Sequence, residues 1–301
     1  MSRKIIYFVN PISGTRGKED LIKRIEKKTT LQNIAFEILP TRADGNYFFL
    51  KEKISREHIT DIVICGGDGT VSQVAGTLLD ESINIGIIPM GSGNGLALGA
   101  KIPKRIDKAL DLIFTGKAAY IDSFFINSTF SCMLCGLGFD AKVAGDFSRQ
   151  PKRGLATYIK QTFINFIHVR PWSFEITNKG KSFITSAYFI SIANSNQFGN
   201  HFTIAPMASL HDGLLDIVVV KKMSKLRFLW AVLHQVSGGK IKEYDEKTFH
   251  KKGVVYFQTD KLIIHNPDEA PLHIDGDPAY TSKKIIIEII PDAFKLIQPE
   301  K

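Results

Sequence analysis

The feature that most constrains the fold is an alternation, over residues 1–122, of short apolar runs with segments of helical periodicity. The helical segments lie between the runs, and the apolar runs occupy residues 4–10, 35–39, 61–65 and 83–88. Strands that alternate with helices are connected by right-handed crossovers and form a mostly parallel sheet. We therefore predict that residues 1–122 fold as an α/β domain, with a parallel sheet and flanking helices.

The pattern changes beyond Ser123. Two helical patterns, at residues 155–167 and 226–236, interrupt a series of runs that are rich in β-branched and aromatic residues. Those runs occupy residues 173–176, 183–193, 215–220, 254–258, 262–265 and 285–290. Short strands of this kind are typical of an antiparallel β-sandwich. Residues 123–290 are thus predicted to form a second domain, and residues 291–301 could pack back on the first.

Three glycine-rich segments follow predicted strands of the first domain, at residues 10–17, 66–70 and 91–95. Because parallel sheets bind ligands at the carboxyl ends of their strands, we expect the three loops to form one site. Backbone N–H groups and the helix dipole at such a turn face an anion. The positive charge of Lys18 suits a triphosphate ligand. The Asp68 carboxylate could hold Mg²⁺ through water, or it could cap a helix instead.

Two common nucleotide-binding motifs do not occur in these loops. The Gly17-Lys18 pair is followed by Glu19, so the spacing of a Walker A loop fails. None of the three loops contains G-x-G-x-x-G, which argues against a dinucleotide-binding dehydrogenase.

Charge and cysteine content narrow the class of partner and the compartment. Lysine and arginine total 39 against 30 aspartate and glutamate residues, and the net charge of +9 favours anionic partners. The basic residues are scattered among acidic ones, so nucleic-acid binding is not expected.

The chain starts in an apolar strand without a signal-peptide pattern, and no transmembrane helix is evident. A cytoplasmic location is therefore expected. The three cysteines fit a reducing compartment, with Cys132 and Cys135 predicted as buried core thiols.

Three motifs occur in a characteristic order: Asn10-Pro-Ile-Ser-Gly14, Gly66-Gly-Asp-Gly-Thr70 and Pro89-Met-Gly-Ser-Gly-Asn94. With these separations they resemble the diacylglycerol kinase catalytic-domain family, which includes bacterial lipid kinases and the sphingosine and ceramide kinases. The resemblance continues through residues 138–140, 194–199, 206–216 and 275–277, and so covers nearly the whole chain. It implies an ATP-binding α/β domain, a β-sandwich lipid domain, and a cleft between them where the γ-phosphate of ATP passes to a lipid hydroxyl.

The resemblance also implies roles for individual residues. The family's general base falls on Asp275, and Asp68 with Mg²⁺ would organise the phosphates. The magnesium-associated segment falls on Ser209, Asp212 and Leu214, with the Asp212 carboxylate and the carbonyls of the other two as ligands. The nucleotide loops fall on the following residues, to which Lys18 is added for its charge: Asn10, Gly14, Thr41, Gly67, Asp68, Gly69, Thr70, Ser92, Gly93 and Asn94.

Departures from the family pattern leave the substrate open. Gly95 follows Asn94 where many bacterial members have an acidic residue, so this loop looks closer to the sphingosine and ceramide kinases. The family's Asp-Gly-Glu motif appears here as Asp275-Gly276-Asp277. The Asp277 side chain is one methylene shorter than the family's glutamate, so a role for Asp277 is less certain than one for Asp275. The acceptor is thus a diacylglycerol or a sphingoid-type lipid. Asp122 and Asp140 are further candidates for the cleft, with capping or turn roles as the alternative.

A lipid substrate requires access to a membrane. Apolar and basic residues in two predicted helices could contact an anionic membrane surface, or the apolar ones could cover the sandwich core instead. We expect a peripheral enzyme at the inner membrane surface, and a homodimer is an additional option. The residues concerned are Leu226, Phe228, Leu229, Trp230 and Leu233 with Lys225 and Arg227, and Tyr158, Phe163 and Phe166 with Lys152 and Arg153.

Two rival functions stay open at this point. NAD kinases share a Gly-Gly-Asp-Gly-Thr loop and a similar two-domain plan, although the second glycine-rich loop and the Asp275 segment favour a lipid kinase. A catalytically silent nucleotide- or lipid-binding regulator would explain the shortened Asp277 side chain. The retention of Asp68, Asp212 and Asp275 together argues against that alternative.

Overall fold

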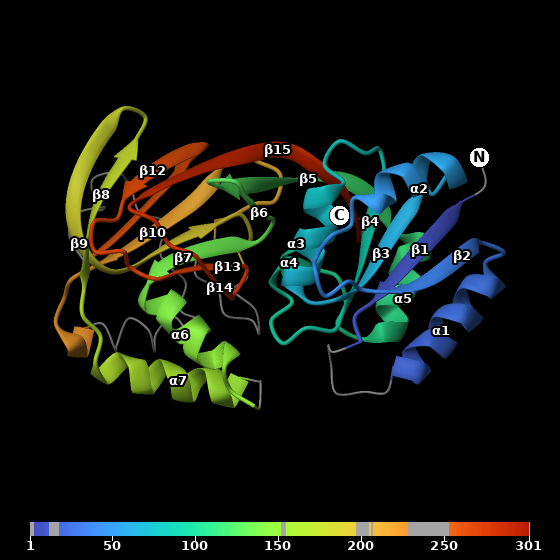
Figure 1. Ribbon diagram of the computed structural model, residues 1–301, viewed down its shortest axis with the longest axis horizontal. Helices are drawn as coiled ribbons and strands as arrows, with labels where there is room; N and C mark the ends of the chain where they lie inside the picture. The colour runs from blue at the N-terminus through green and yellow to red at the C-terminus, as the bar shows by residue number, and fades with distance from the viewer. Residues whose placement is uncertain are drawn as a thin grey trace. The chain divides into compact units, whose positions relative to one another are not determined.

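A computed structural model describes residues 3–11, 18–151, 155–196, 205, 207–227 and 253–300 (Figure 1). The chain divides into two compact units. The first comprises Met1–Asp122 and Pro291–Lys301, and the second comprises Ser123–Ile290. In the described part of the chain, no helix is both long enough and apolar enough to cross a membrane.

The first unit is built on a parallel sheet, as predicted, with strand order β2-β1-β3-β4. Its strands are β1 (Lys4–Val9), β2 (Ala35–Pro40), β3 (Asp61–Gly66) and β4 (Asn84–Pro89). β1 and β3 lie in the middle of the sheet and are buried on both faces, which is why both read as continuous apolar runs. The end of β15 (Lys284–Gln298) adds a further parallel strand beside β4.

Helices flank this sheet at the segments of helical periodicity. Buried side chains of the first and fifth helices form one apolar core with β1, β3 and the end of β4. The two helices are also joined by an ion pair between Arg24 and Asp107. The helices are α1 (Lys18–Leu31), α2 (Phe49–Glu57), α3 (Asp68–Thr77), α4 (Gly95–Gly99) and α5 (Ile106–Thr115) (Figure 1).

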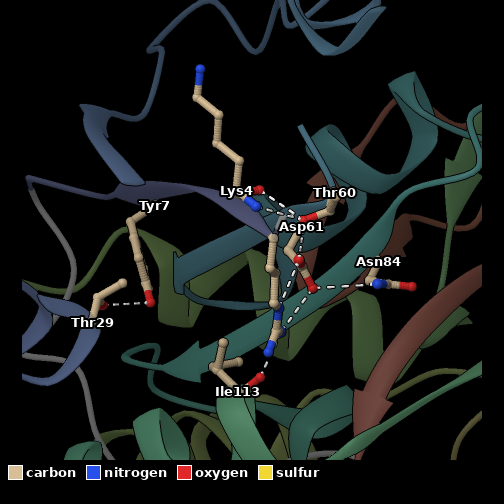
Figure 2. A network of polar contacts seen from close by, with 8 residues as sticks. Lys4, Tyr7, Thr29, Thr60, Asp61, Asn84 and Ile113 are labelled. Carbon is tan, nitrogen blue, oxygen red and sulfur yellow. Dashed lines mark hydrogen bonds and ion pairs between the residues drawn. The ribbon is translucent and has the colours of Figure 1, made fainter. Parts of the chain in front are cut away.

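A partly buried ion pair anchors the amino-terminal end of the same sheet (Figure 2). Asp61 is fully buried and accepts two hydrogen bonds from the Arg3 guanidinium, at 2.9 Å from Nε and 2.8 Å from Nη2. Thr60 and Asn84 also donate to the Asp61 carboxylate, and Arg3 donates to the carbonyl of Ile113 at 2.7 Å. Because the strands are parallel, this network lies at the opposite end of β3 from the glycine-rich loops, so we assign it a structural role.

The second unit is the predicted antiparallel β-sandwich. β9 lies between β7 and β8 and also pairs with β10, and β12 joins β8 to β15. Aliphatic and aromatic side chains such as Phe124, Phe174 and Ile190 fill its core. The strands are β5 (Lys117–Ile126), which begins in the first unit, β6 (Thr129–Ser131), β7 (Leu134–Gly138), β8 (Trp172–Asn178), β9 (Lys181–Ala193), β10 (Leu215–Lys221), β11 (Val254–Thr259), β12 (Lys261–His265), β13 (Leu272–Ile274) and β14 (Asp277–Ala279).

Two helices, α6 (Phe139–Ser148) and α7 (Leu155–Ile167), pack on each other within the second unit (Figure 1). Their inner side chains join a second apolar cluster with residues of β9 and β10. The predicted helix at 155–167 is therefore confirmed. Residues 225–227 are also helical, and the rest of the helix predicted at 226–236 lies outside the described residues.

Candidate functional site

Two glycine-rich turns meet at the carboxyl ends of β3 and β4. A Cβ atom placed on Gly91 would lie 2.6 Å from the Cα of Gly67, and one placed on Gly67 would lie 3.1 Å from the Cα of Gly91. The N–H of Met90 also donates to the carbonyl of Gly66 at 2.9 Å. Because only glycine allows the two backbones to approach so closely, the loops form a joint cradle, defined here by Gly67 and Gly91.

The side chains of Asp68 and Asn94 hold this cradle in shape. The Asp68 carboxylate accepts hydrogen bonds from the backbone N–H groups of Gly95 at 3.0 Å and Leu96 at 3.2 Å. Asp68 is therefore a helix cap, but of α4 and not of α3, whose first residue it is. Asn94 has a left-handed backbone (φ 53°), and its amide group exchanges two hydrogen bonds of 2.7 Å with the backbone of Gly91.

Other residues predicted to bind nucleotide lie along the same edge of the sheet. Asn10 follows β1, and its Nδ2 donates to Thr70 Oγ1 at 3.2 Å at the start of α3. Thr41 follows β2, and its N–H donates to the carbonyl of Val9 at 3.1 Å. Of the remaining predicted residues, Gly69 and Gly93 are half-buried, Ser92 is exposed, and Gly14 lies outside the described residues.

Lys18 begins helix α1 and places a buried ammonium group near this edge. Its Nζ has no hydrogen-bond partner among the described residues. Burial lowers the pKa of the Lys18 ammonium, and Cys65, near the end of β3, acts in the opposite direction. A buried cation without a counter-ion costs free energy unless a ligand neutralises it. An ammonium group together with backbone N–H groups at helix N-termini fits a phosphate ligand.

Asp275, in the second unit, is held in one orientation by three donors. Its carboxylate is buried, and Oδ1 accepts hydrogen bonds from the hydroxyl of Ser131 at 2.7 Å and from the N–H groups of Met133 at 3.2 Å and Leu134 at 3.1 Å. These bonds stabilise the ionised form and fix the plane of the group. A carboxylate held in this way suits a general base, which must be positioned before it can accept a proton.

Asp275 and Gly276 form the two-residue turn of the β13–β14 hairpin. Ile274 pairs with Asp277 across the hairpin, and the two residues between them have φ angles of 50° and 87°. Positive φ at both central positions is the signature of a type I′ turn, for which Asp-Gly is a preferred sequence. The turn thus sets the direction of the Asp275 side chain.

A buried aspartate and histidine lie beside this turn. His273, on β13, is fully buried, and its Nε2 lies 3.5 Å from Oδ2 of Asp140. Its Nδ1 accepts a hydrogen bond from the N–H of Gly276 at 3.3 Å. A Cβ atom on Gly136 would lie 2.1 Å from Asp140 Oδ2 and 2.6 Å from His273 Nε2, so only glycine leaves room for the pair.

Ser131, Gly136 and His273 were not predicted from the sequence as site residues. The Asp-Gly dipeptide at 275–276, next to apolar residues, is a hairpin signal that could have drawn attention to His273. Ser131 has no comparable signal, because it reaches Asp275 from a position 144 residues earlier in the chain.

The predicted magnesium segment forms a tight turn in the second unit. Oδ1 of Asp212 accepts a hydrogen bond from the N–H of Leu214 at 3.1 Å, Gly213 is left-handed (φ 68°), and Ser209 Oγ accepts a backbone hydrogen bond at 3.2 Å. Burial, and in smaller part the charge of Asp212, raises the pKa of Asp216 to about 7. The described residues contain no cluster of three or more His, Cys, Asp or Glu side chains that could hold a metal ion. A hard cation here would need backbone and water oxygens beside Asp212.

Asp122 and the cysteines serve the folded structure. The buried Asp122 carboxylate accepts a hydrogen bond at 3.0 Å from the N–H of Asp292, which is left-handed (φ 50°), so Asp122 has the turn role named as its alternative. Cys132 and Cys135 are buried thiols that form no disulfide, as predicted, and so is Cys65. Burial raises the pKa of the Cys65 and Cys135 thiols, which keeps both protonated.

The residues considered for membrane contact divide between core and surface. Tyr158 and Phe166 pack against an apolar cluster of the second unit, whereas Phe163 is 48% exposed. Leu226 is exposed as well. Six other residues of the two predicted segments lie outside the described residues: Lys152, Arg153, Phe228, Leu229, Trp230 and Leu233.

Two family models match the chain and together span most of it. A diacylglycerol kinase catalytic domain matches residues 4–126, and a YegS C-terminal NAD kinase beta sandwich-like domain matches residues 134–298. A relative from Yersinia enterocolitica, named "Probable lipid kinase YegS-like", is 30% identical over 96% of this chain and 95% of its own. The diacylglycerol kinase of Bacillus subtilis is 24% identical over 91% of this chain and 89% of its own.

A solved structure of a diacylglycerol kinase from Bacillus anthracis has the same fold, with a TM-score of 0.73 at 19% identity over 98% of this chain and 97% of its own. An α/β unit with a glycine cradle at its strand ends, joined to an antiparallel β-sandwich, defines a class of two-domain kinases. Within that class, the chain belongs to the family of lipid kinases that contain the diacylglycerol kinase catalytic domain and the YegS C-terminal domain.

Proposed function

We propose that this lipid kinase uses ATP and Mg²⁺ and transfers the γ-phosphoryl group to a hydroxyl of a diacylglycerol or sphingoid-type lipid. The observation that carries the proposal is the buried Lys18 ammonium, which interacts with Cys65 near the end of β3 and has no hydrogen-bond partner among the described residues. Such a group calls for an anion, and in a kinase family that anion is the phosphate chain of the nucleotide.

Each proposed role follows from the contacts of the residue. Backbone N–H groups of the cradle and the Lys18 ammonium would bind phosphate oxygens and neutralise the charge that builds on them. Asp68 would shape this site by holding α4 in place. Asp275 would accept the proton that the lipid hydroxyl loses as its oxygen attacks the γ-phosphorus.

Mg²⁺, when bound, would supply further positive charge at the transferred group or stiffen the lipid-binding unit. Asp212 is the proposed side-chain ligand, with the carbonyls of Ser209 and Leu214 beside it. The oxygen donors of this turn fit a hard cation.

The direct test is transfer of labelled γ-phosphate from ATP to lipids in mixed micelles, with diacylglycerol, monoacylglycerol, sphingosine and ceramide assayed separately. A labelled lipid supports the proposal and names the acceptor class. Labelled NADP from an NAD control would favour an NAD kinase instead. If no acceptor is labelled while ATP still binds, the protein is a silent nucleotide-binding regulator and the proposed activity is wrong.

Replacing Lys18 with Met should weaken nucleotide binding and stabilise the ligand-free protein. Loss of a charge-assisted contact to phosphate is expected to raise the Kd for ATP by about 10- to 100-fold. Removal of a buried, uncompensated ammonium should raise the unfolding midpoint when no nucleotide is present. Isothermal titration calorimetry and thermal unfolding measure the two effects.

Lys27→Met is the matched control, because Lys27 is an exposed lysine of the same helix and the charge change is identical. Its ATP affinity should equal that of the wild type. Equal ATP affinity in the Lys18 and Lys27 variants would remove Lys18 from the nucleotide site.

Helix α7 is a candidate for membrane contact, because it buries two polar side chains and exposes several large apolar ones. Gln161 and Asn165 are buried, and Asn165 Nδ2 donates to Asp146 at 2.8 Å. The helix exposes four large side chains, which we call the α7 apolar face: Ile159, Phe163, Ile164 and Ile167.

We propose that the α7 apolar face inserts into the interface of an anionic bilayer. The exposed basic residues Lys160, Arg170 and Lys225 lie on or next to this helix, and Lys225 Nζ donates to the carbonyl of Ile167 at 2.6 Å. Apolar side chains bordered by basic ones are typical of peripheral contact with acidic lipids. This contact would place the protein at the inner membrane surface without a spanning helix.

Phe163→Glu should reduce binding to vesicles of phosphatidylglycerol and phosphatidylcholine by about tenfold, because it removes an apolar side chain and adds a repelled charge. Vesicle co-sedimentation at two salt concentrations measures the effect. Ile184→Glu changes an 81% exposed residue of β9 and should bind like the wild type. If Phe163→Glu binds vesicles normally and instead dissociates a homodimer in analytical ultracentrifugation, the α7 apolar face is a subunit interface.

A further inference from the structure

The imidazole of His273 holds the Asp275–Gly276 turn through a hydrogen bond to its backbone. The N–H of Gly276 points at Nδ1 of this ring at 3.3 Å, so Nδ1 must be the acceptor and carry no proton. In a neutral imidazole the single ring proton then lies on Nε2. The ring is fully buried, so water cannot substitute for either contact without a rearrangement of the core.

Asp140 supplies the reason for this tautomer. Its Oδ2 lies 3.5 Å from Nε2 of His273 and accepts no hydrogen bond from the described residues, while its Oδ1 accepts one from the N–H of Ala141 at 2.8 Å. A buried carboxylate oxygen that faces a ring nitrogen favours the proton on that nitrogen. The charge of Asp140 therefore stabilises the Nε2–H form and leaves the lone pair of Nδ1 for Gly276.

The turn needs such support because Asp275 must satisfy two geometric conditions at once. Its backbone is left-handed, with a φ angle of 50°, a conformation that aspartate adopts more readily than most residues but less freely than glycine. The same residue must also keep Oδ1 against Ser131 and the N–H groups of Met133 and Leu134. A small rotation of the turn would move the carboxylate away from these donors.

Gly136 shows that the fold makes room for this arrangement. It is paired with His273 across the β7–β13 ladder, and a side chain at this position would overlap both members of the Asp140–His273 pair. The glycine lies within a buried strand, which glycine weakens. We therefore take the room that it leaves for the Asp140–His273 pair as the reason for glycine at this position.

We propose that Asp140 and His273 are positioning residues for the general base: Asp140 fixes the Nε2–H tautomer of His273, and Nδ1, as a hydrogen-bond acceptor, holds the Asp275–Gly276 turn. The inference rests on the proposed role of Asp275 in phosphoryl transfer. Neither residue needs to touch the substrate, because both act through the backbone of the turn.

Asp140→Asn tests the tautomer directly. The Asn amide can donate to Nε2, which would move the ring proton to Nδ1, where it would oppose the N–H of Gly276. Long-range ¹H–¹⁵N spectra of ¹⁵N-histidine-labelled protein distinguish the two tautomers, and His273→Asn identifies the His273 signal among the 8 histidines. We expect Nε2–H in the wild type and Nδ1–H in Asp140→Asn.

The kinetic test separates positioning from simple stability. Asp140→Asn and His273→Leu should lower kcat by about 10- to 100-fold with the KM for ATP unchanged, because a displaced base slows the chemical step only. His273→Asn can place an amide oxygen where Nδ1 lies, so it should recover most of the activity that His273→Leu loses. A role in packing alone would give His273→Asn and His273→Leu the same kcat.

Each failure has a separate meaning. A wild-type His273 in the Nδ1–H or doubly protonated form overturns the inference, even if the Asp140 variant does not fold. An unchanged kcat in a folded Asp140→Asn protein with the altered tautomer also overturns it. If the wild type phosphorylates no lipid, the proposed function fails, and the tautomer experiment still decides whether the Asp140–His273 device exists.

Discussion

Replacing Asp275 with Asn is expected to lower kcat for lipid phosphorylation by about 10²- to 10⁴-fold, because the amide cannot accept the proton of the attacking hydroxyl. The fold should survive. Asn tolerates the left-handed backbone at this position, and its Oδ1 can keep the hydrogen bonds from Ser131, Met133 and Leu134. The ATP affinity should stay at the wild-type value, since the proposed nucleotide residues belong to the first unit.

Initial rates of labelled phosphate transfer and calorimetric titration with ATP measure the two parts of this prediction. Glu288→Gln is the control, because it neutralises an exposed carboxylate of the same unit that pairs with Lys261 at the surface. Its rate should match the wild type. An Asp275→Asn rate within about threefold of the wild type would require another proton acceptor and would remove the role proposed for Asp275.

Asp61→Ala is the substitution with the largest expected effect on stability, about 3–5 kcal/mol in the free energy of unfolding. It removes a fully buried carboxylate and leaves the Arg3 guanidinium without its partner at the end of the sheet (Figure 2). Thr60 and Asn84 would lose an acceptor at the same time. Urea unfolding followed by circular dichroism measures the change.

The surface pair of Lys117 and Glu300 provides the contrast. Their side chains are 76% and 73% exposed, so Glu300→Gln should change the free energy of unfolding by less than about 0.5 kcal/mol. The double variant Arg3→Met with Asp61→Leu should recover part of the loss, because no unpaired charge remains. Equal losses in Asp61→Ala and Glu300→Gln would show that burial of the Arg3–Asp61 pair has no energetic consequence.

The fold was largely predictable from local patterns. Parallel strands buried on both faces read as unbroken apolar runs, as in β3, and the sandwich strands read as short runs with β-branched residues. β5 was not predicted, nor was the pairing of β15 with three strands, β12, β5 and β4. Strand pairing of this kind depends on which segments meet in space, and the periodicity of one segment does not contain that information.

The site was predictable where a residue type is required by backbone geometry. Gly67 and Gly91 lie where a Cβ atom would collide with the opposite loop, so glycine at both strand ends is itself the signal. The charged residues were harder to interpret. The alternatives of a metal-associated carboxylate and a helix cap for Asp68 look the same in sequence, because both use the same oxygen atoms at the same turn.

The sequence alone determined the two architectures and the places where the glycine-rich loops begin. Crossover chirality, the period of the side chains and the absence of a Cβ atom each act over a few neighbouring residues. Tertiary structure alone decided what each charged group contacts. Asp68 caps a helix 27 residues further along the chain, and Asp275 accepts a hydrogen bond from a residue 144 positions earlier. The ammonium group of Lys18 is buried without a hydrogen-bond partner in the described part of the chain. The free energy of a charge depends on the dipoles and ions around it in space, and distant segments of the chain supply them.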